Sequence, residues 1–398
     1  MSHEQDAGKR HCRRTRILLT GASGFLGIHL AQMLVNKGYF IYLPVRPYKN
    51  TSPEKRMQKL FQWVGMDYPD PAHVRIIPAD LNRSDLGLSR EEYRRLASGV
   101  DEIIHCASDT SFSEQKRGQV EKANVENLHH LLGFAATGNC FCFHHISTAY
   151  VAGKRRGPCP EVPAQTTRYY NVYEETKHRA EKTAALFCRQ HGLHLNIYRP
   201  SVVYGHSQTG RTLRFNALYY PVKTLLFLKN LYYEDFMHKS GKNAGKMGIS
   251  FDKNGRAHLP IRIETVPGSG INLIPVDYFT DAFSAVMETQ KKGGIYHLVN
   301  DKNTSIAQLI DYSQRYFNIS GMEAVGSENM HPGSKNHLEL LFERCIRTYK
   351  PYMKDARIFE NHHTRAVLDN HGISCPEFDY PMFARCMQYA LAENWGNN

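Results

Sequence analysis

The sequence predicts an α/β fold, with a doubly wound parallel sheet and a smaller, mainly helical substrate lobe. Three observations support this fold class. An apolar run at residues 17–19 leads through a glycine-rich turn into a helical pattern. Strand-like and helix-like segments then alternate as far as residue 205, which is typical of right-handed βαβ units. From residue 212 the chain becomes rich in Leu, Tyr and Phe, which indicates a second structural unit.

The glycine-rich turn, TGASGFLG at residues 20–27, follows the first strand directly. Gly21 permits the tight turn, Gly24 lets backbone N–H groups approach a pyrophosphate, and Gly27 lets the helix pack closely on the strand. The helix N-terminus adds N–H donors and partial positive charge. The alternative is an ordinary strand-to-helix turn, but the strand before and the helix after favour a Rossmann-type dinucleotide site. The turn residues expected to contact the cofactor are Gly21, Ser23, Gly24, Phe25, Leu26 and Gly27.

The second predicted strand, residues 39–46, ends in a basic residue. Enzymes that use NAD place Asp or Glu at this point to bind the ribose 2′-hydroxyl, whereas this chain has Arg46, with Lys55 and Arg56 close behind. A guanidinium suits a 2′-phosphate in charge and in bidentate geometry. We therefore expect NADP(H) as the cofactor, bound by Arg46 and Arg56; a solvated basic turn is the alternative.

The third predicted strand, residues 74–79, ends at Asp80 and Leu81. This is a usual place for a carboxylate that faces an adenine amino group. Both residues are therefore expected to contact the cofactor.

A helix over residues 90–98 leads to a fourth strand over 101–108. This strand ends in the small residues Cys106, Ala107 and Ser108, where backbone contacts to the nicotinamide side are expected. A helix beginning at residues 124–125 and a fifth strand over 144–150, ending in hydroxyl groups, continue the alternation.

The candidate chemistry lies in YEETK, where Tyr173 and Lys177 stand four residues apart and so share one helix face. A tyrosine acts as a general acid near neutral pH when its pKa falls, and a nearby ammonium favours the phenolate. Lys177 can also reach the nicotinamide ribose, and Thr148 supplies a further hydrogen bond to a carbonyl oxygen. By itself the spacing is common on helix surfaces, but the glycine-rich turn and Thr148 favour a catalytic set of Thr148, Tyr173 and Lys177.

A further strand at residues 195–198 is followed by a predicted loop over 199–205, in which Pro200, Ser201 and Val202 are expected to contact the cofactor. Residues 212–236 permit three interpretations: core helices of a substrate lobe, an apolar pocket or lid for an acyl chain, or an interfacial helix on a membrane.

The predicted domain division has three parts. Residues 1–15 form a basic flexible tail, and residues 16–205 form the NADP-binding domain, to which 271–300 return. Residues 206–270 and 301–398 form the substrate lobe.

Composition narrows the class of protein. With 41% hydrophobic and 22% charged residues the chain is that of a globular protein, and neither a secretory signal nor a membrane span is expected. Nine scattered cysteines show no disulfide framework and no metal-ligand spacing, so we expect a cytoplasmic protein without a metal site. The net charge of +12 suits a phosphate-bearing molecule or a membrane face. No nucleic-acid motif accompanies that charge, so no nucleic-acid partner is expected.

Taken together, these motifs resemble the extended short-chain dehydrogenase/reductase family. The segments DLNRSDLGLSREEY, VDEIIHCASDTSF, ISTAYVAG, NVYEETKHRAE, YRPSVVYGHSQTG and NLIPVDYFTDA are similar to its thioester-reductase and fatty acyl-CoA reductase branch, of the male-sterility type. The likeness covers about residues 16–300; from there on, it is only vague.

The resemblance implies NADPH-dependent reduction of an acyl thioester, carried on CoA or a carrier protein, to an aldehyde, and it leaves open a further reduction to an alcohol. It implies a catalytic set of Thr148, Tyr173 and Lys177. Two alternatives remain: another extended-family reaction (ketone reduction, lipid-alcohol oxidation, or nucleotide-sugar epimerisation or dehydration), and a nucleotide-sensing scaffold without turnover. The sequence leaves chain length, carrier and oligomeric state open.

Overall fold

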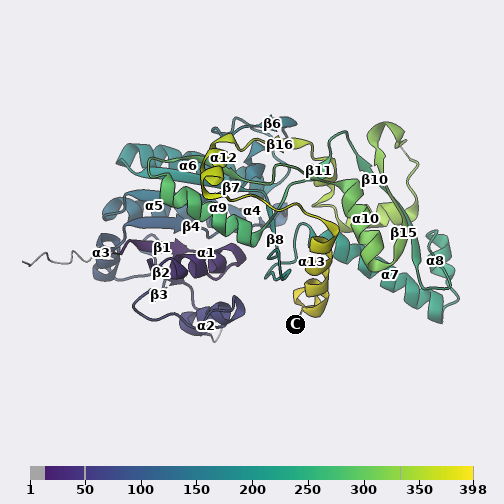
Figure 1. The fold of residues 1–398 in the computed structure, drawn as a ribbon, viewed down its shortest axis with the longest axis horizontal. Helices are drawn as coiled ribbons and strands as arrows, with labels where there is room; N and C mark the ends of the chain where they lie inside the picture. The colour runs from purple at the N-terminus through teal and green to yellow at the C-terminus, as the bar shows by residue number, and fades with distance from the viewer. Residues whose placement is uncertain (1–13, 49–50, 332, 398) are drawn as a thin grey trace, which may run out of the picture.

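A computed structural model of the chain describes residues 14–48, 51–331 and 333–397. Most of the predicted basic tail, residues 1–15, lies outside these ranges. The main sheet has seven parallel strands in the order β13-β7-β5-β4-β1-β2-β3 (Figure 1). These strands are β1 (Arg16–Thr20), β2 (Phe40–Val45), β3 (Val74–Pro78), β4 (Glu102–His105), β5 (Cys142–Ile146), β7 (His194–Pro200) and β13 (Gly294–Leu298).

Helices cover both faces of the sheet. Because alternate residues of a strand point to opposite sides, each apolar strand contributes side chains to two cores. On β1, Ile17 and Leu19 pack in one core together with side chains of α1 and α9. Leu18 packs in the opposite core with side chains of α3, α5 and α6. The bounds of these helices are α1 (Phe25–Asn36), α3 (Arg90–Gly99), α5 (Asn127–Thr137), α6 (Val172–His191) and α9 (Val276–Thr289). The predicted doubly wound α/β fold is confirmed.

The second unit forms its own core beside this sheet (Figure 1). Its helices are α7 (Tyr219–His238), α8 (Lys242–Lys246), α10 (Ile306–Phe317), α11 (His337–Cys345) and α13 (Tyr380–Ala392). It also contains a three-stranded sheet of β9 (Ser250–Phe251), β10 (Ala257–Thr265) and β15 (Ile319–Gly326), with β10 between the other two. The lobe is therefore less purely helical than the composition suggests, because β10 pairs with a strand that follows some 60 residues later.

Helix α7 settles part of the question over residues 212–236. Val222, Leu225 and Leu228 are buried in the lobe core, as the first interpretation predicts. The opposite face is also apolar, since Phe227 is 59% exposed and Leu231 is 48% exposed. Among the described residues no helix is both long and apolar enough to cross a membrane.

Four local predictions differ from the structure. The predicted fourth strand, 101–108, is β4 and ends at His105, so Cys106, Ala107 and Ser108 lie in the loop after it. The predicted loop 199–205 is largely strand: β7 runs to Pro200, and β8 (Val202–Tyr204) pairs with β12 (Leu273–Pro275). β5 ends at Ile146, and a short 3-10 turn covers Ala149–Ala152. The helix expected from residue 124 begins earlier, as α4 (Arg117–Glu121) and a π-helical turn (Lys122–Glu126) lead into α5.

The predicted division, which assigns all of 301–398 to the lobe, also differs from the structure. β16 (Arg357–Phe359) pairs with β6 (Gly157–Cys159), beyond the carboxyl end of β5. Val367 and Leu368 of α12 (His362–Leu368) pack in the same core as β1 and α9. Residues 355–375 thus return to the main sheet because their apolar side chains complete its core.

Candidate active site

The glycine-rich turn joins β1 to α1 in the geometry that a dinucleotide site requires. Gly21 has φ +75°, and a Cβ there would lie 2.6 Å from the backbone nitrogen of Ala107. A Cβ on Gly27 would lie 2.0 Å from the carbonyl oxygen of Gly21. Both positions therefore require glycine, one for the turn and the other for close packing of the helix.

The N-terminus of α1 is open to an anion. Gly24 is the N-cap residue, no side chain caps the helix, and its first turn holds no acidic residue. The Gly24 N–H itself closes the turn on the Gly21 carbonyl oxygen at 2.9 Å. The N–H donors of the following residues, which include Phe25 and Leu26, begin the helix, where a phosphate is favoured by their direction and by the helix dipole.

Basic side chains lie at the end of β2. Arg46 is exposed there, and the Arg56 guanidinium donates to the Arg46 carbonyl oxygen at 2.6 Å. Arg56 also lies over the Tyr48 ring, 5.5 Å from its centre. The structure thus brings the two predicted 2′-phosphate ligands to the same point of the sheet edge.

Asp80 and Leu81 follow β3 as expected. One Asp80 carboxylate oxygen accepts hydrogen bonds from the Asn82 backbone and side-chain nitrogens, at 3.1 and 2.6 Å. The Leu81 carbonyl oxygen lies 2.9 Å from Nδ1 of His130. These bonds fix the loop after β3.

The loop after β4 is held by Thr20 and by Asn124, a residue that the sequence did not single out. The Ala107 N–H donates to Thr20 Oγ1 at 3.3 Å, and Ser108 Oγ donates to Asn124 Oδ1 at 3.0 Å. Asn124 Nδ2 donates in turn to Thr176 Oγ1 of α6 at 3.0 Å. Asn124 therefore ties the loop that carries Cys106, Ala107 and Ser108 to the helix that carries Tyr173.

Thr148 and Tyr173 come together beyond the carboxyl end of β5. The Thr148 hydroxyl lies beside the Tyr173 phenol, where it opposes the rise in the pKa of Tyr173. Thr148 Oγ1 accepts a hydrogen bond from the Tyr150 N–H at 3.3 Å and donates one to the Pro200 carbonyl oxygen at 3.4 Å. One helical turn further along α6, Lys177 Nζ donates to the Ile146 carbonyl oxygen at 2.5 Å. The three predicted catalytic residues therefore share one site.

The expected lowering of the Tyr173 pKa does not occur in this arrangement. Burial raises the pKa of Tyr173 to about 12, and the Thr148 side chain opposes that rise only in part. Burial also lowers the pKa of Lys177 to about 8, an effect that Cys106 and Glu181 partly oppose. The sequence shows the spacing of the pair but not its desolvation, which is the largest cause of both pKa shifts.

Hydroxyl groups at this sheet edge are left for a ligand. Ser201 Oγ and Ser147 Oγ are buried and have no hydrogen-bond partner within the described part of the chain. The Ser201 N–H donates to Leu298 O, and the Val202 N–H donates to Asn272 O, which fixes the loop after Pro200. With the glycine turn, these unpaired groups fit a nicotinamide dinucleotide. Within residues 14–48, 51–331 and 333–397, no group of three or more His, Cys, Asp or Glu is placed to hold a metal ion.

A polar cavity of about 300 Å³ opens beside the first turn of α6. Basic and acidic side chains line it together, among them Arg117, Lys154, Arg168, Glu114 and Glu175. Tyr173 does not line this cavity, although Asn171 and Glu175 on either side of it do. The Tyr173 ring stacks instead on the Phe112 ring, with ring centres 5.8 Å apart.

Comparisons with known proteins agree with this geometry. The family model described as "Male sterility protein" matches residues 19–283. Fatty acyl-CoA reductase 2 of Homo sapiens is 31% identical over 223 residues, which cover 47% of this chain and 43% of the human protein. The chain spans less than half the length of the first curated relatives that it matches.

Two solved structures share the fold over nearly the whole chain. The terminal R domain from the myxalamid PKS-NRPS biosynthetic pathway has a TM-score of 0.72 at 23% identity and covers 96% of this chain and 92% of that one. UDP-glucuronic acid 4-epimerase from Bacillus cereus in complex with NAD has a TM-score of 0.63 at 16% identity, over 96% of this chain and 99% of that one. At these identities the likeness establishes the fold alone.

Proposed function

The chain belongs to the male sterility protein family, in the fatty acyl-CoA reductase branch of the extended short-chain dehydrogenases/reductases, and from this premise we propose that it reduces an acyl thioester to an aldehyde with NADPH. The observation that carries the proposal is the placement of Thr148 beside the Tyr173 phenol, one helical turn from Lys177. Overall, one thioester, one NADPH and one proton give one aldehyde, one thiol and NADP⁺.

Each residue has a role that follows from its environment. Bound NADPH supplies the hydride. With a pKa raised to about 12, Tyr173 keeps its proton at neutral pH, so its phenol donates a hydrogen bond to the carbonyl oxygen and then the proton that this oxygen gains. The Thr148 hydroxyl is the second donor to that oxygen, and two fixed donors stabilise the developing alkoxide. Lys177 orients the nicotinamide ribose beside them.

Collapse of the resulting hemithioacetal breaks the C–S bond and releases the aldehyde. The hydroxyl of the hemithioacetal loses its proton as the C=O bond re-forms, and this proton neutralises the departing thiolate. Lys177, whose pKa is lowered to about 8, is charged at neutral pH and stands close to the transition to its neutral form, so it can return a proton to Tyr173.

The basic groups at the end of β2 support NADPH over NADH. Arg46 and Arg56 offer two guanidinium groups where an NAD-specific site has a carboxylate. The cavity beside α6, with Arg117, Lys154 and Arg168, suits the phosphate-bearing arm of CoA or of an acyl carrier. The apolar exposed face of α7 suits an acyl chain or a lipid surface, so we propose a cytoplasmic enzyme with peripheral membrane contact.

The first experiment follows NADPH and NADH oxidation by absorbance with acyl-CoA thioesters of several chain lengths, matched aldehydes and ketones. Free thiol, aldehyde and alcohol are quantified in the same samples. NADPH oxidation with equal thiol release supports the proposal, and alcohol formation shows a second reduction. Turnover with ketones or aldehydes alone contradicts thioester reduction, and NAD retained through purification favours an epimerase.

The Tyr173→Phe variant tests the role of the phenol. It removes one oxygen from the site and leaves the ring stacked on Phe112. We expect turnover to be lost and the affinity for NADPH to stay nearly unchanged. Unchanged turnover would remove Tyr173 from the mechanism.

A further inference from the structure

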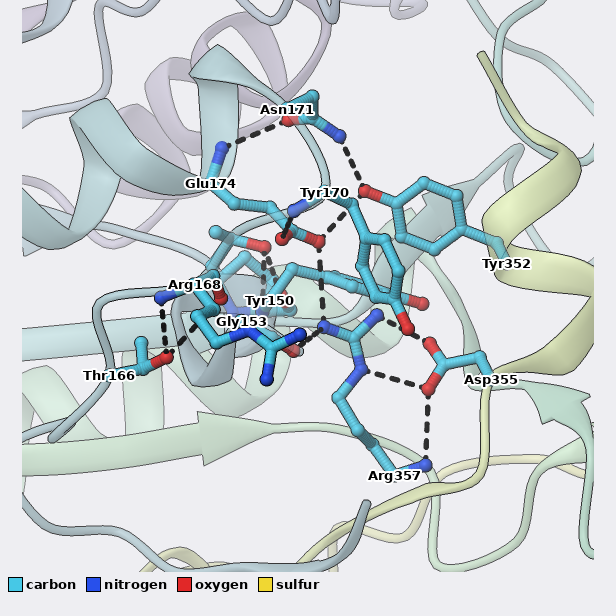
Figure 2. A network of polar contacts seen from close by, with 12 residues as sticks. Tyr150, Gly153, Thr166, Arg168, Tyr170, Asn171, Glu174, Tyr352, Asp355 and Arg357 are labelled. Carbon is cyan, nitrogen blue, oxygen red and sulfur yellow. Dashed lines mark hydrogen bonds and ion pairs between the residues drawn. The ribbon is translucent and has the colours of Figure 1, made fainter. Parts of the chain in front are cut away.

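Residues 349–359, called here the returning segment, fold back over the first turn of α6. The segment contains a 3-10 turn (Lys350–Lys354) and β16. It lies outside residues 19–283, the part of the chain that matches the family model. Its side chains nevertheless reach Gly153, in the turn after Thr148, and Glu174, in the first turn of α6 (Figure 2).

The Tyr352 hydroxyl ties the returning segment to the start of α6. Asn171 caps this helix, because its Oδ1 accepts from the Glu174 N–H at 3.1 Å. Asn171 Nδ2 donates to the Tyr352 hydroxyl at 2.7 Å, and that hydroxyl donates to Glu174 Oε1 at 2.8 Å. One oxygen atom therefore holds both the cap residue and the residue next to Tyr173 (Figure 2).

Arg357 connects α6 to the loop after Thr148. Its guanidinium is fully buried and forms two hydrogen bonds with the Asp355 carboxylate, at 2.8 and 2.6 Å. The remaining nitrogen donates to the Gly153 carbonyl oxygen at 2.8 Å and lies 3.4 Å from Glu174 Oε1. Gly153 ends the 3-10 turn for which Thr148 is the N-cap residue.

Aromatic rings surround the same cation and the catalytic tyrosine. The Arg357 guanidinium lies 4.6 Å from the centre of the Tyr150 ring and 5.7 Å from that of Tyr352. The Phe112 ring contacts both Tyr173 and Tyr352, with ring centres 5.8 and 5.6 Å apart. The packing of Tyr173 is thus continuous with the returning segment.

We propose that Tyr352 and Arg357 are positioning residues that set the separation between the Thr148 hydroxyl and the Tyr173 phenol. One Arg357 nitrogen holds the turn after Thr148 and approaches Glu174 Oε1, and the Tyr352 hydroxyl donates to that same oxygen. Neither residue is placed to touch the dinucleotide turn at α1, so cofactor affinity is independent of both. The inference rests on the proposed catalytic roles of Thr148 and Tyr173.

Substitutions of Arg357 and of Tyr352 are expected to differ in their effect on stability. Arg357 neutralises two buried carboxylates, Asp355 and Glu174, and loss of one partner of such a cluster is strongly destabilising. Tyr352→Phe removes only one oxygen atom and keeps the ring, so the variant is expected to fold. A shift of about 1 Å between catalytic groups can lower turnover about a hundredfold.

The test compares Tyr352→Phe with Tyr278→Phe. Tyr278 is a matched control because its buried hydroxyl also donates one hydrogen bond, at 3.2 Å to Val299 O in the main domain. For each variant we would measure kcat, KM, NADPH affinity by fluorescence, thermal stability, and amide hydrogen exchange over residues 148–153 and 170–177. Arg357→Lys, which keeps the charge but not the fork of donors, is the second variant.

We expect Tyr352→Phe to lower kcat at least about tenfold relative to Tyr278→Phe, with KM and NADPH affinity within about twofold. We also expect amide exchange over both peptides to rise about tenfold, as for the loss of one or two hydrogen bonds. A kcat within about twofold of the control, or equal losses in kcat and in NADPH affinity, overturns the inference.

Failure of the proposed function gives a different pattern. In that case the unmodified chain shows no thioester turnover, or Tyr173→Phe leaves its turnover unchanged. Amide exchange then decides: faster exchange over both peptides in Tyr352→Phe supports positioning by the returning segment, and unchanged exchange overturns it.

Discussion

The buried ammonium of Lys177 lowers the free energy of unfolding of the chain. Burial lowers the pKa of this ammonium from 10.5 to about 8, so at pH 7 the folded chain pays about 3 kcal/mol to keep Lys177 charged. Lys177→Met removes that cost and loses one hydrogen bond from a charged donor to Ile146 O, worth about 1.5–3 kcal/mol. We therefore expect the variant at pH 7 to be at least as stable as the unmodified chain, by up to about 1.5 kcal/mol.

The sign of the pH dependence follows from the direction of the pKa shift. Because the folded-state pKa is lowered, the unfolded chain binds the extra proton between pH 8 and pH 10.5, and the cost fades as pH rises through this window. The advantage of Lys177→Met should fall by about 2–3 kcal/mol from pH 7 to pH 10, where other titrating groups cancel in the difference.

Urea unfolding of both proteins at several pH values measures this difference. Lys292→Met, at an exposed lysine, is the matched control for the loss of one positive charge. A difference between Lys177→Met and the unmodified chain that stays constant from pH 7 to pH 10 would refute the argument that burial controls Lys177.

Three further predictions follow from packing and charge. Gly27→Ala should lower the free energy of unfolding by more than about 3 kcal/mol, because its Cβ would lie 2.0 Å from a backbone oxygen. Gly133→Ala, whose Cβ would enter open space on α5, should raise the free energy of unfolding by about 0.5–1 kcal/mol. Urea unfolding measures both. Arg46→Ala should weaken NADPH binding at least about tenfold and leave NADH binding unchanged in fluorescence titrations; equal effects on both cofactors would contradict the 2′-phosphate role. In urea unfolding, Leu228→Ala should lower the free energy of unfolding by about 2–5 kcal/mol, because Leu228 is buried. Leu231→Ser should lower it by less than about 0.5 kcal/mol, because Leu231 is 48% exposed.

The sequence predicted best what depends on neighbours along the chain. The strand, turn and helix around Gly21 follow from local periodicity, and a four-residue spacing brings Tyr173 and Lys177 to one face of α6. The position of Thr148 near them follows from the parallel sheet, whose strands end at one edge. The structure contains all of these features.

The sequence did not predict what depends on distant partners. β8 forms only because β12 pairs with it 70 residues later, so its residues resembled a loop. The pKa values of Tyr173 and Lys177 depend on burial, which spacing alone does not show. Arg357 joins Glu174 across 183 residues, and no local pattern marks such a contact.

The position of the returning segment late in the chain also affects the order in which the parts of the site form during synthesis. During synthesis the glycine turn and the strands β1, β2, β3, β4, β5 and β7 leave the ribosome well before residues 352–357, so a dinucleotide can meet its turn while α6 still lacks these partners. Glu174, the residue next to Tyr173, stays without its Arg357 partner until a residue 183 positions later has been synthesised. Closing so long a loop is slow compared with forming local contacts. The nascent chain is therefore expected to acquire cofactor binding first and catalytic competence last.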